Sequence, residues 1–173
     1  MTSPESESLT SWTITHLTDL YSRPDTPEPT GEAQPHVDLT TQLNTTLDAS
    51  LAPDAELWLN HRRVSRAEFA EFLGKGRGLT KKGEVECKSE DCIESLVEDG
   101  KPEEGSVVAG TATIVHTHPW RIRAAPAKTR VVVVFSAKIQ KNPEPQIVQL
   151  FHTWASKPFP IVMPHRQVDA DAL

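Results

Sequence analysis

The spacing of apolar residues changes near residue 84 from a helical period to a strand period, and this change limits the possible folds more than any other feature. Before it, residues 9–21 and 38–51 each carry a single apolar stripe, which predicts two amphipathic helices. After it, four segments rich in β-branched residues predict four strands, at 84–97, 106–118, 128–140 and 146–155. Helices followed by strands are the order of an α+β domain.

A short hairpin and a third helix are predicted between these two halves. Residues 55–64 alternate between apolar and polar types around an Asn-His pair at 60–61, which predicts two short strands joined by a tight turn. Ser65, with Glu68 three residues later, has the pattern of a capping box, so a helix is expected to begin there. The glycines at 74, 76 and 78 are expected to end this helix, and they follow a helix rather than a strand, which argues against a phosphate-binding loop.

The domain plan predicted from composition is one domain with two polar ends. Residues 1–7 are polar and acidic and are expected to be a disordered N-terminus, and residues 158–173 a C-terminal tail. The domain itself is expected to span 8–157, with a Pro-rich insert at 22–36. The insert is not interpreted as a domain boundary, because only the helix at 9–21 is expected before it and a single helix cannot fold alone.

Charge and hydropathy restrict the expected partners and location. The net charge of −6 argues against a general nucleic-acid-binding protein, which usually has a basic surplus. Positive charge is nevertheless concentrated in two segments, 62–82 and 121–141. These residues could form one basic patch, but we interpret them as separate solvated lysines and arginines. The longest apolar run, 131–135, is too short to span a membrane, and residues 1–9 lack the features of a secretory signal. A cytoplasmic protein without a nucleic-acid or membrane partner is expected.

The two cysteines do not form a disulfide framework. Cys87 and Cys92 are five residues apart, which places them on opposite faces of an ideal strand. Without a bulge or turn between them they cannot bridge, so reduced thiols are expected.

The order of elements, together with the segment 57–69 (LWLNHRRVSRAEF), resembles the nuclear transport factor 2-like superfamily, in particular its SnoaL-like and ketosteroid-isomerase-like members. In that family a short hairpin leads into a capped helix with paired aromatics, which Phe69 and Phe72 match, whereas His61 stands where glycine is common. The resemblance implies a cone: a curved antiparallel sheet of four long strands plus a short hairpin, packed on three N-terminal helices around an apolar pocket. It also implies a homodimer through the outer sheet face, and the consecutive apolar residues at 131–135 indicate a central strand covered on both faces.

Candidate site residues follow from chemistry and from the expected cone. The acid–base candidates are the histidines His152 and His118, because an unperturbed imidazole titrates near neutrality, and the strand aspartate Asp91. The ligand-binding candidates are aromatic or histidine side chains expected near the cone, namely Trp58, Phe72, His116, Phe135 and Trp154. The tyrosine and acid that stabilise an enolate in ketosteroid-isomerase-like enzymes have no matching pair, because Tyr21 is the only tyrosine.

No cofactor or metal is predicted. The segment from Gly110 to His118 is similar to the first half of a cupin metal motif, since His116 and His118 share one strand face. The carboxylate expected next is missing, because Arg121 and Arg123 occupy that region, and the second half of the motif is absent.

Three functions therefore remain open. The first is a pocket that binds a small apolar molecule in a homodimer, without an assignable reaction. The second is a cofactor-independent lyase, cyclase or isomerase of the SnoaL-like type that uses histidine and aspartate as acid and base. The third is a protein-interaction module that uses the outer sheet face and the basic loops to bind another chain. Fold alone does not choose among them.

Overall fold

The computed structural model describes residues 8–23, 39–78, 80–96, 105–122, 125–141 and 144–158. The predicted disordered start, the Pro-rich insert and the C-terminal tail lie almost entirely outside these residues. The described part has the predicted order of helices and strands: α1 (Leu9–Tyr21), α2 (Leu39–Ser50), β1 (Leu51–Leu59), β2 (Arg62–Val64), α3 (Arg66–Gly78), β3 (Lys82–Leu96), β4 (Ser106–Ile122), β5 (Ala125–Lys141) and β6 (Pro145–Pro158).

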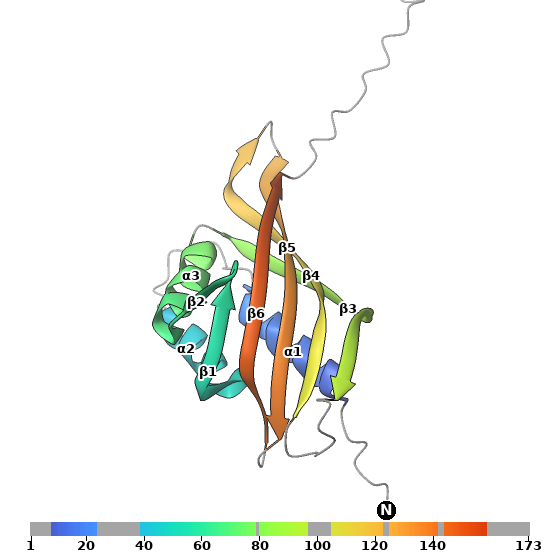
Figure 1. Cartoon of the computed structure of the whole chain (residues 1–173). Coiled ribbons are helices and arrows are strands. Elements are labelled where there is room, and N and C mark those ends of the chain that lie inside the picture. Colours follow the sequence, from blue (N-terminus) through green and yellow to red (C-terminus); the bar gives the residue numbers. More distant parts are fainter. Residues whose placement is uncertain are drawn as a thin grey trace, which may run out of the picture.

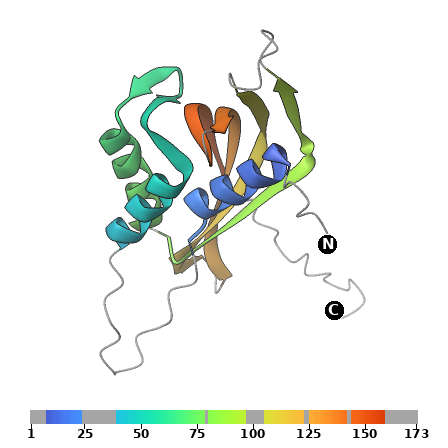
Figure 2. The ribbon, with the colours of Figure 1, turned by 90° about the horizontal axis from the view of Figure 1, so that it is seen from below.

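The strands form one curved, open sheet in the order β2-β1-β6-β5-β4-β3. The four long strands β3 to β6 pair antiparallel, as predicted, and the hairpin joins their edge through a parallel pairing of β1 with β6. Helix α1 crosses the concave face of this sheet, while α2 and α3 lie beside β1 (Figures 1 and 2). This arrangement confirms the α+β fold of three helices and a curved sheet. None of the helices in the described segments is long and apolar enough to cross a membrane.

The hydrophobic core lies between the concave face and the helices. Along β5, alternate side chains from Val131 to Ile139 are buried on this face, because side chains of a strand alternate between its two faces. The intervening residue Val134 points to the convex face and is 53% exposed. The expected central position of β5, between β4 and β6, is confirmed, and within the single chain nothing described covers Val134 on the convex face.

The hairpin turn and the third helix begin as predicted. Asn60 and His61 both have positive φ, 49° and 65°, as a two-residue turn of type I′ requires. The capping box is present: the Ser65 amide donates to Glu68 Oε2 at 2.8 Å, and the Glu68 amide donates to Ser65 Oγ at 3.2 Å. Helix α3 continues through Gly78, however, so the first two of its glycines do not end it.

Two strand irregularities differ from the sequence-based expectation. Strand β4 does not end before Pro119 but continues to Ile122, because a register shift between Thr117 and Arg121 accommodates the missing N–H of proline. In β3 a bulge between Cys87 and Cys92 brings the two cysteines to the same side of the sheet, where their Sγ atoms are 4.0 Å apart and remain free thiols. The parity argument that separated the cysteines fails because the bulge adds residues that β4 does not match.

Candidate functional site

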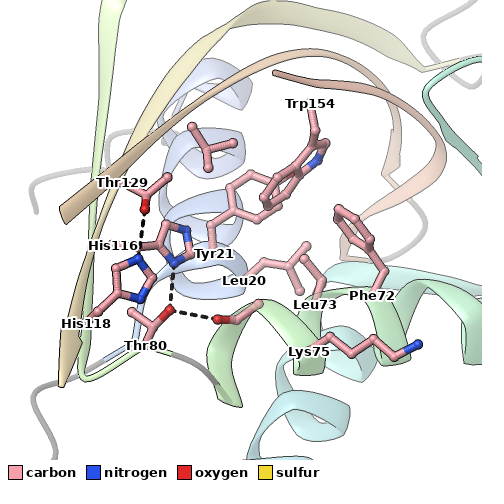
Figure 3. Close-up of a pocket in the computed structure, with 12 residues that line it drawn as sticks. Leu20, Tyr21, Phe72, Leu73, Lys75, Thr80, His116, His118, Thr129 and Trp154 are labelled. Atoms are coloured by element: carbon pink, nitrogen blue, oxygen red, sulfur yellow. Dashed lines mark hydrogen bonds between the residues drawn. The ribbon is translucent and has the colours of Figure 1, made fainter. Parts of the chain in front are cut away.

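A cavity of about 430 Å³ lies where the ends of α1 and α3 meet the concave face of β4, β5 and β6. Figure 3 shows the side chains that surround it. Its lining is mostly apolar and aromatic, and it consists of Leu20, Tyr21, Phe72, Leu73, Lys75, Gly76, Thr80, His116, His118, Thr129, Val131 and Trp154. A space of this size between two helices and a sheet is typical of a small-molecule site.

The cavity forms where the inward-facing side chains of β4 change from apolar to polar. Ile114 is fully buried in the core, and the next two inward positions are the polar residues His116 and His118. At the same end, α3 finishes with glycines that carry no side chain to fill the space, and Gly76 lines the cavity. The helices therefore leave this end of the concave face incompletely filled.

The ring of His116 is held in one orientation by a short hydrogen-bonded chain (Figure 3). The Thr80 hydroxyl donates to the carbonyl oxygen of Gly76 at 2.7 Å, and its oxygen is 2.9 Å from His116 Nδ1. Because a hydroxyl has only one proton, His116 Nδ1–H is the donor to Thr80, and the lone pair lies on Nε2. Burial, with a further contribution from the neighbouring His118, lowers the pKa of His116 and favours the neutral ring. Nε2 is buried without a hydrogen-bond partner in the described part of the chain.

His118 lies at the rim of the cavity. Its Nε2 is 2.8 Å from Thr129 Oγ1 on the adjacent strand β5 (Figure 3). Its ring stacks on Trp120 with 4.3 Å between the ring centroids. His118 therefore connects the cavity with the end of β4 that projects beyond it.

Tyr21 and His152 form a buried pair behind one wall of the cavity. The Tyr21 hydroxyl is hydrogen-bonded to His152 Nε2, although 131 residues separate them in the sequence. Burial lowers the pKa of His152 to about 3 and raises the pKa of Tyr21 well above its ordinary value. Both groups are therefore neutral at pH 7. Tyr21 lines the cavity, whereas His152 is 3% exposed and stacks against Phe69.

Trp154 forms an aromatic wall with its neighbours. Its ring meets Tyr21 and Phe72 edge to face, at centroid distances of 5.4 and 5.0 Å. Its Nε1–H is buried and has no acceptor among the residues that the structure describes. Two residues that line the cavity, His116 and Trp154, thus each have a buried ring nitrogen without a partner in the described part of the chain.

The structure brings together four of the residues singled out from the sequence and places a fifth just behind them. Phe72, His116, His118 and Trp154 line the cavity, and His152 contacts it only through Tyr21. The remaining three lie elsewhere. Asp91 is exposed at the bulge of β3, Trp58 stacks on Phe151, and Phe135 fills the core beside Gly110.

The reasons for these three placements are physical. Trp58 follows the inward-facing Leu57, so strand alternation directs it to the convex face. Phe135 occupies the space that Gly110 leaves open on β4, and so it packs the core instead of lining the cavity. Asp91 belongs to the extra residues of the bulge, which are directed to solvent.

Sequence reasoning missed Tyr21, Thr80 and Thr129 as cavity residues. Tyr21 could have been found, because the only tyrosine of the chain lies on the apolar stripe of the first helix. No local pattern marks Thr80 or Thr129, since their roles depend on histidines of another strand. Within the described segments no group of three or more histidine, cysteine or acidic side chains could hold a metal ion.

Comparison with known proteins supports the fold. No protein-family model and no curated protein matches the sequence. A chain in the crystal structure of the Candida albicans Mtr2–Mex67 M domain complex superposes with a TM-score of 0.54 at 15% identity, covering 89% of this chain and 98% of that one. Candida albicans Mtr2 alone gives a TM-score of 0.52 at 16% identity, covering 89% and 96%. An NTF-2-like protein of unknown function from Pseudomonas aeruginosa gives 0.40 at 14% identity, covering 83% and 93%.

Sequence identities this low carry information about the fold alone. The element order and the curved sheet that wraps a helix agree with the architecture inferred from the sequence. The chain has the cone-shaped fold of the nuclear transport factor 2-like type.

Proposed function

We propose that the chain binds a small apolar molecule with one polar group in the cavity between α1, α3 and the sheet. The observation that carries this proposal is an apolar space of about 430 Å³ whose lining includes His116 and Trp154, each with a buried ring nitrogen that has no hydrogen-bond partner in the described part of the chain. Apolar walls favour transfer of an apolar molecule from water, by about 25 cal/mol per Å² of surface buried.

The two unpaired polar atoms indicate what the polar group of the ligand must do. A buried donor or acceptor without a partner costs about 1–3 kcal/mol. A hydroxyl can donate to His116 Nε2 or accept from Trp154 Nε1–H, so a phenol or an alcohol is able to satisfy either atom. An aromatic or alicyclic molecule with one hydroxyl is therefore the class of ligand that fits the cavity.

A fluorescent apolar dye, anilinonaphthalene sulfonate, tests occupancy of the cavity. Val131→Phe fills the cavity from its wall, and we expect it to weaken dye binding at least about tenfold, because the dye loses buried apolar contact. Val134→Phe is the matched control: it makes the same change on the same strand but on the convex face. Equal loss in both variants, or no binding by the unchanged protein, would contradict the proposal.

Comparison of naphthol with naphthalene tests the polar contact. The unchanged protein is expected to bind naphthol more tightly, by about tenfold for one satisfied buried hydrogen bond. His116→Phe keeps a flat ring but removes Nε2, so the preference for naphthol is expected to disappear while naphthalene binding is retained. Calorimetry measures both ligands, and a preference that persists in the variant would exclude His116 as the acceptor.

Acid–base catalysis is a second candidate, favoured by the neutral ring of His116. Its fixed tautomer leaves the unprotonated nitrogen on Nε2, and Tyr21, whose hydroxyl is bonded to His152, lines the same cavity. Such a pair suits proton removal next to a carbonyl without a cofactor. The ketone β-tetralone in deuterated water is a suitable probe, because magnetic resonance reports exchange of its acidic C–H. Exchange no faster than in buffer, or undiminished in His116→Phe, would reject catalysis by His116.

A homodimer through the convex sheet face is the third candidate. Val134 and Phe151 are 53% and 41% exposed there, and Phe151 stacks on Trp58 at 5.6 Å. The Mtr2–Mex67 M domain complex is a chain of similar fold assembled with another protein. Sedimentation is expected to give a dimer that Val134→Arg dissociates, because a charge placed in an apolar interface is not paired. Ile93→Arg, which changes an exposed residue of β3, is the control, and a monomer at micromolar concentration would refute the dimer.

A further inference from the structure

The ends of β4 and β5 form a hairpin arm that projects beyond the rest of the sheet (Figure 1). We define the arm as residues 118–122 of β4 and 125–130 of β5. Pairing of β3 with β4 stops at Thr117, and pairing of β5 with β6 begins at Thr129. Most of the arm is therefore paired only with itself, through Arg121 with Pro126 and Ile122 with Ala125.

The arm exposes two large apolar side chains. Trp120 is 50% exposed and Ile122 is 49% exposed, although both types of side chain favour removal from water. They lie two residues apart near the end of a self-paired hairpin, and about half of each side chain stays exposed even though the Trp120 ring stacks on His118. Neighbouring exposed apolar side chains of this size form a candidate contact site.

Positive charge lies on the same arm, on the face opposite Trp120 and Ile122, because Arg121 pairs with Pro126 on the side of Lys128 and Arg130, whereas Ile122 pairs with Ala125. Arg121, Lys128 and Arg130 lie on the arm, and no acidic residue occurs between 121 and 141. The strand register adds Lys82, which shares the pairing partner Thr117 with Lys128, and Lys157, which pairs with Arg130. Glu84, bonded to Lys82 at 2.8 Å, is an acid beside this set. A chain with a net charge of −6 thus concentrates cations at one end.

The arm begins at the rim of the cavity. His118 lines the cavity and stacks on Trp120, and Thr129 on the opposite strand lines it too. An apolar molecule that leaves the surface around Trp120 would meet the cavity directly behind His118. The exposed apolar residues, the cations and the cavity are therefore parts of one end of the molecule.

We propose that this end docks on the surface of an anionic phospholipid bilayer through Trp120 and Ile122, and that the apolar ligand enters the cavity from the bilayer. Tryptophan favours the interface between headgroups and acyl chains, and each nearby lysine or arginine is attracted by anionic lipids. A nucleic acid would satisfy the cations but not the aliphatic Ile122. The route for the ligand rests on the proposed function of the cavity, whereas the docking does not.

This proposal departs from the sequence-based expectation of no membrane partner. That expectation rested on the lack of an apolar run long enough to span a bilayer. Docking on the surface needs no spanning segment; it needs two signals, here apolar side chains and a set of cations.

Flotation of the full chain with vesicles tests the docking. We expect binding to vesicles of phosphatidylcholine with phosphatidylglycerol and little binding to phosphatidylcholine alone, with a loss at high salt because ions screen the cations. Trp120→Ala is expected to weaken binding about tenfold, through lost apolar burial. Ile93→Ala is the matched control, because Ile93 is 74% exposed but lies on β3 outside the arm. Its binding should equal that of the unchanged protein.

A second pair of variants tests the charges. Arg130→Ala removes a cation of the arm, and a loss of about fivefold is expected for one charge near an anionic surface. Lys138→Ala removes a cation from the same strand outside the arm and is expected to have a smaller effect. Equal losses in these two variants would show an unspecific attraction and would overturn the arm as the docking site.

The remaining outcomes separate the alternatives. No difference between the two vesicle types, or an unchanged affinity of Trp120→Ala, overturns the proposal. If vesicles do not bind and Trp120→Ala converts an oligomer to a monomer in sedimentation, the arm is a contact between protein chains, which also overturns it.

Dye binding in the cavity without vesicles is measured separately. Docking without dye binding would therefore reject the proposed function alone, and dye binding without docking would reject this inference alone.

Discussion

The two ends of the concave sheet face differ in how completely they are filled. At one end Phe135 packs over Gly110, and the Sγ of Cys92 fits so closely that a Cβ built on Gly110 would lie 2.6 Å away. At the other end, the same strands β4 and β5 border a cavity of about 430 Å³. One sheet therefore carries both a close-packed core and an open site, and a few inward-facing residues decide which is which.

We therefore expect residues at the filled end to determine folding stability and residues at the cavity to determine ligand binding. Protein interiors are close-packed, so changes at the filled end should cost folding free energy. Side chains at the cavity already lack neighbours on one side, so changes there should alter ligand binding more than folding. Variants at matched positions of the two ends can test this division.

The largest expected effect compares phenylalanines of the two ends. Phe135→Ala is expected to lower the free energy of unfolding by about 3–5 kcal/mol, because Phe135 is 2% exposed and its loss leaves a cavity. Phe72→Ala should cost only about 1–2 kcal/mol, because Phe72 is half-buried and already borders an empty space. Urea denaturation measures both. Similar costs would mean that the two ends are equally well packed.

The next effect concerns the buried Tyr21–His152 pair behind the cavity. The pKa of His152 falls from about 6.5 in the unfolded chain to about 3 in the folded one, because burial disfavours the charged ring. Below pH 6.5 the unfolded chain therefore binds the extra proton. Stability should fall by about 1.4 kcal/mol per pH unit from pH 6.5 toward pH 3 and should not change through this group above pH 6.5.

The double variant Tyr21→Phe/His152→Phe removes both partners of this bond and should lack this part of the pH dependence. Urea denaturation of both proteins at pH 7 and at pH 5 is expected to show a larger loss in the unchanged protein, by about 2 kcal/mol. His116, whose pKa is also lowered by burial, is present in both proteins and so does not affect the difference. Parallel pH profiles would mean that His152 protonates in the folded state.

A smaller effect is expected from glycines that differ in their surroundings. Gly110→Ala should destabilise by about 1–3 kcal/mol, since its Cβ would press on Cys92 and on the backbone oxygen of Asp91. Gly74→Ala in α3 has no atom within 4 Å of the new Cβ and should stabilise by about 0.5–1 kcal/mol through helix propensity. Thermal unfolding compares the two changes. A stabilising Gly110→Ala would mean that the filled end is loosely packed.

The smallest effect is expected at the mouth of the cavity. Lys75 pairs with Glu71 one helical turn away at 2.7 Å, but both side chains are mostly exposed. Lys75→Ala should therefore change the free energy of unfolding by less than about 0.5 kcal/mol. Urea denaturation is sufficient to measure it, and a cost near that of Phe72→Ala would give the mouth a structural role.

Local patterns in the sequence predicted the local structure well. The apolar stripe of residues 9–21 matches helix α1, and the capping box of Ser65 and Glu68 begins α3 as expected. The turn at Asn60 and His61 also follows from its position between two short strands. These features depend on interactions between residues that are close in sequence, so a single sequence is enough to reveal them.

The candidate site was predicted only in part, because it depends on pairs of distant residues. His116 and Trp154 line the cavity, but the partner that holds His116 is Thr80, which lies between α3 and β3. Trp58 was expected near the ligand although its neighbour Leu57 faces inward, and strand alternation alone would have placed Trp58 outside. Bulges are a second source of error, because the one in β3 changes which residues of that strand share a face.

The sequence by itself determined the elements of this protein, since backbone preferences and hydrophobic periods act over a few residues. Only the tertiary structure decided which sheet face became concave, which end stayed open, and that the only tyrosine would meet His152 from 131 residues away. The physical reason is that strand register and sheet curvature arise from the packing of all the elements together, and the period of a single strand contains no information about either.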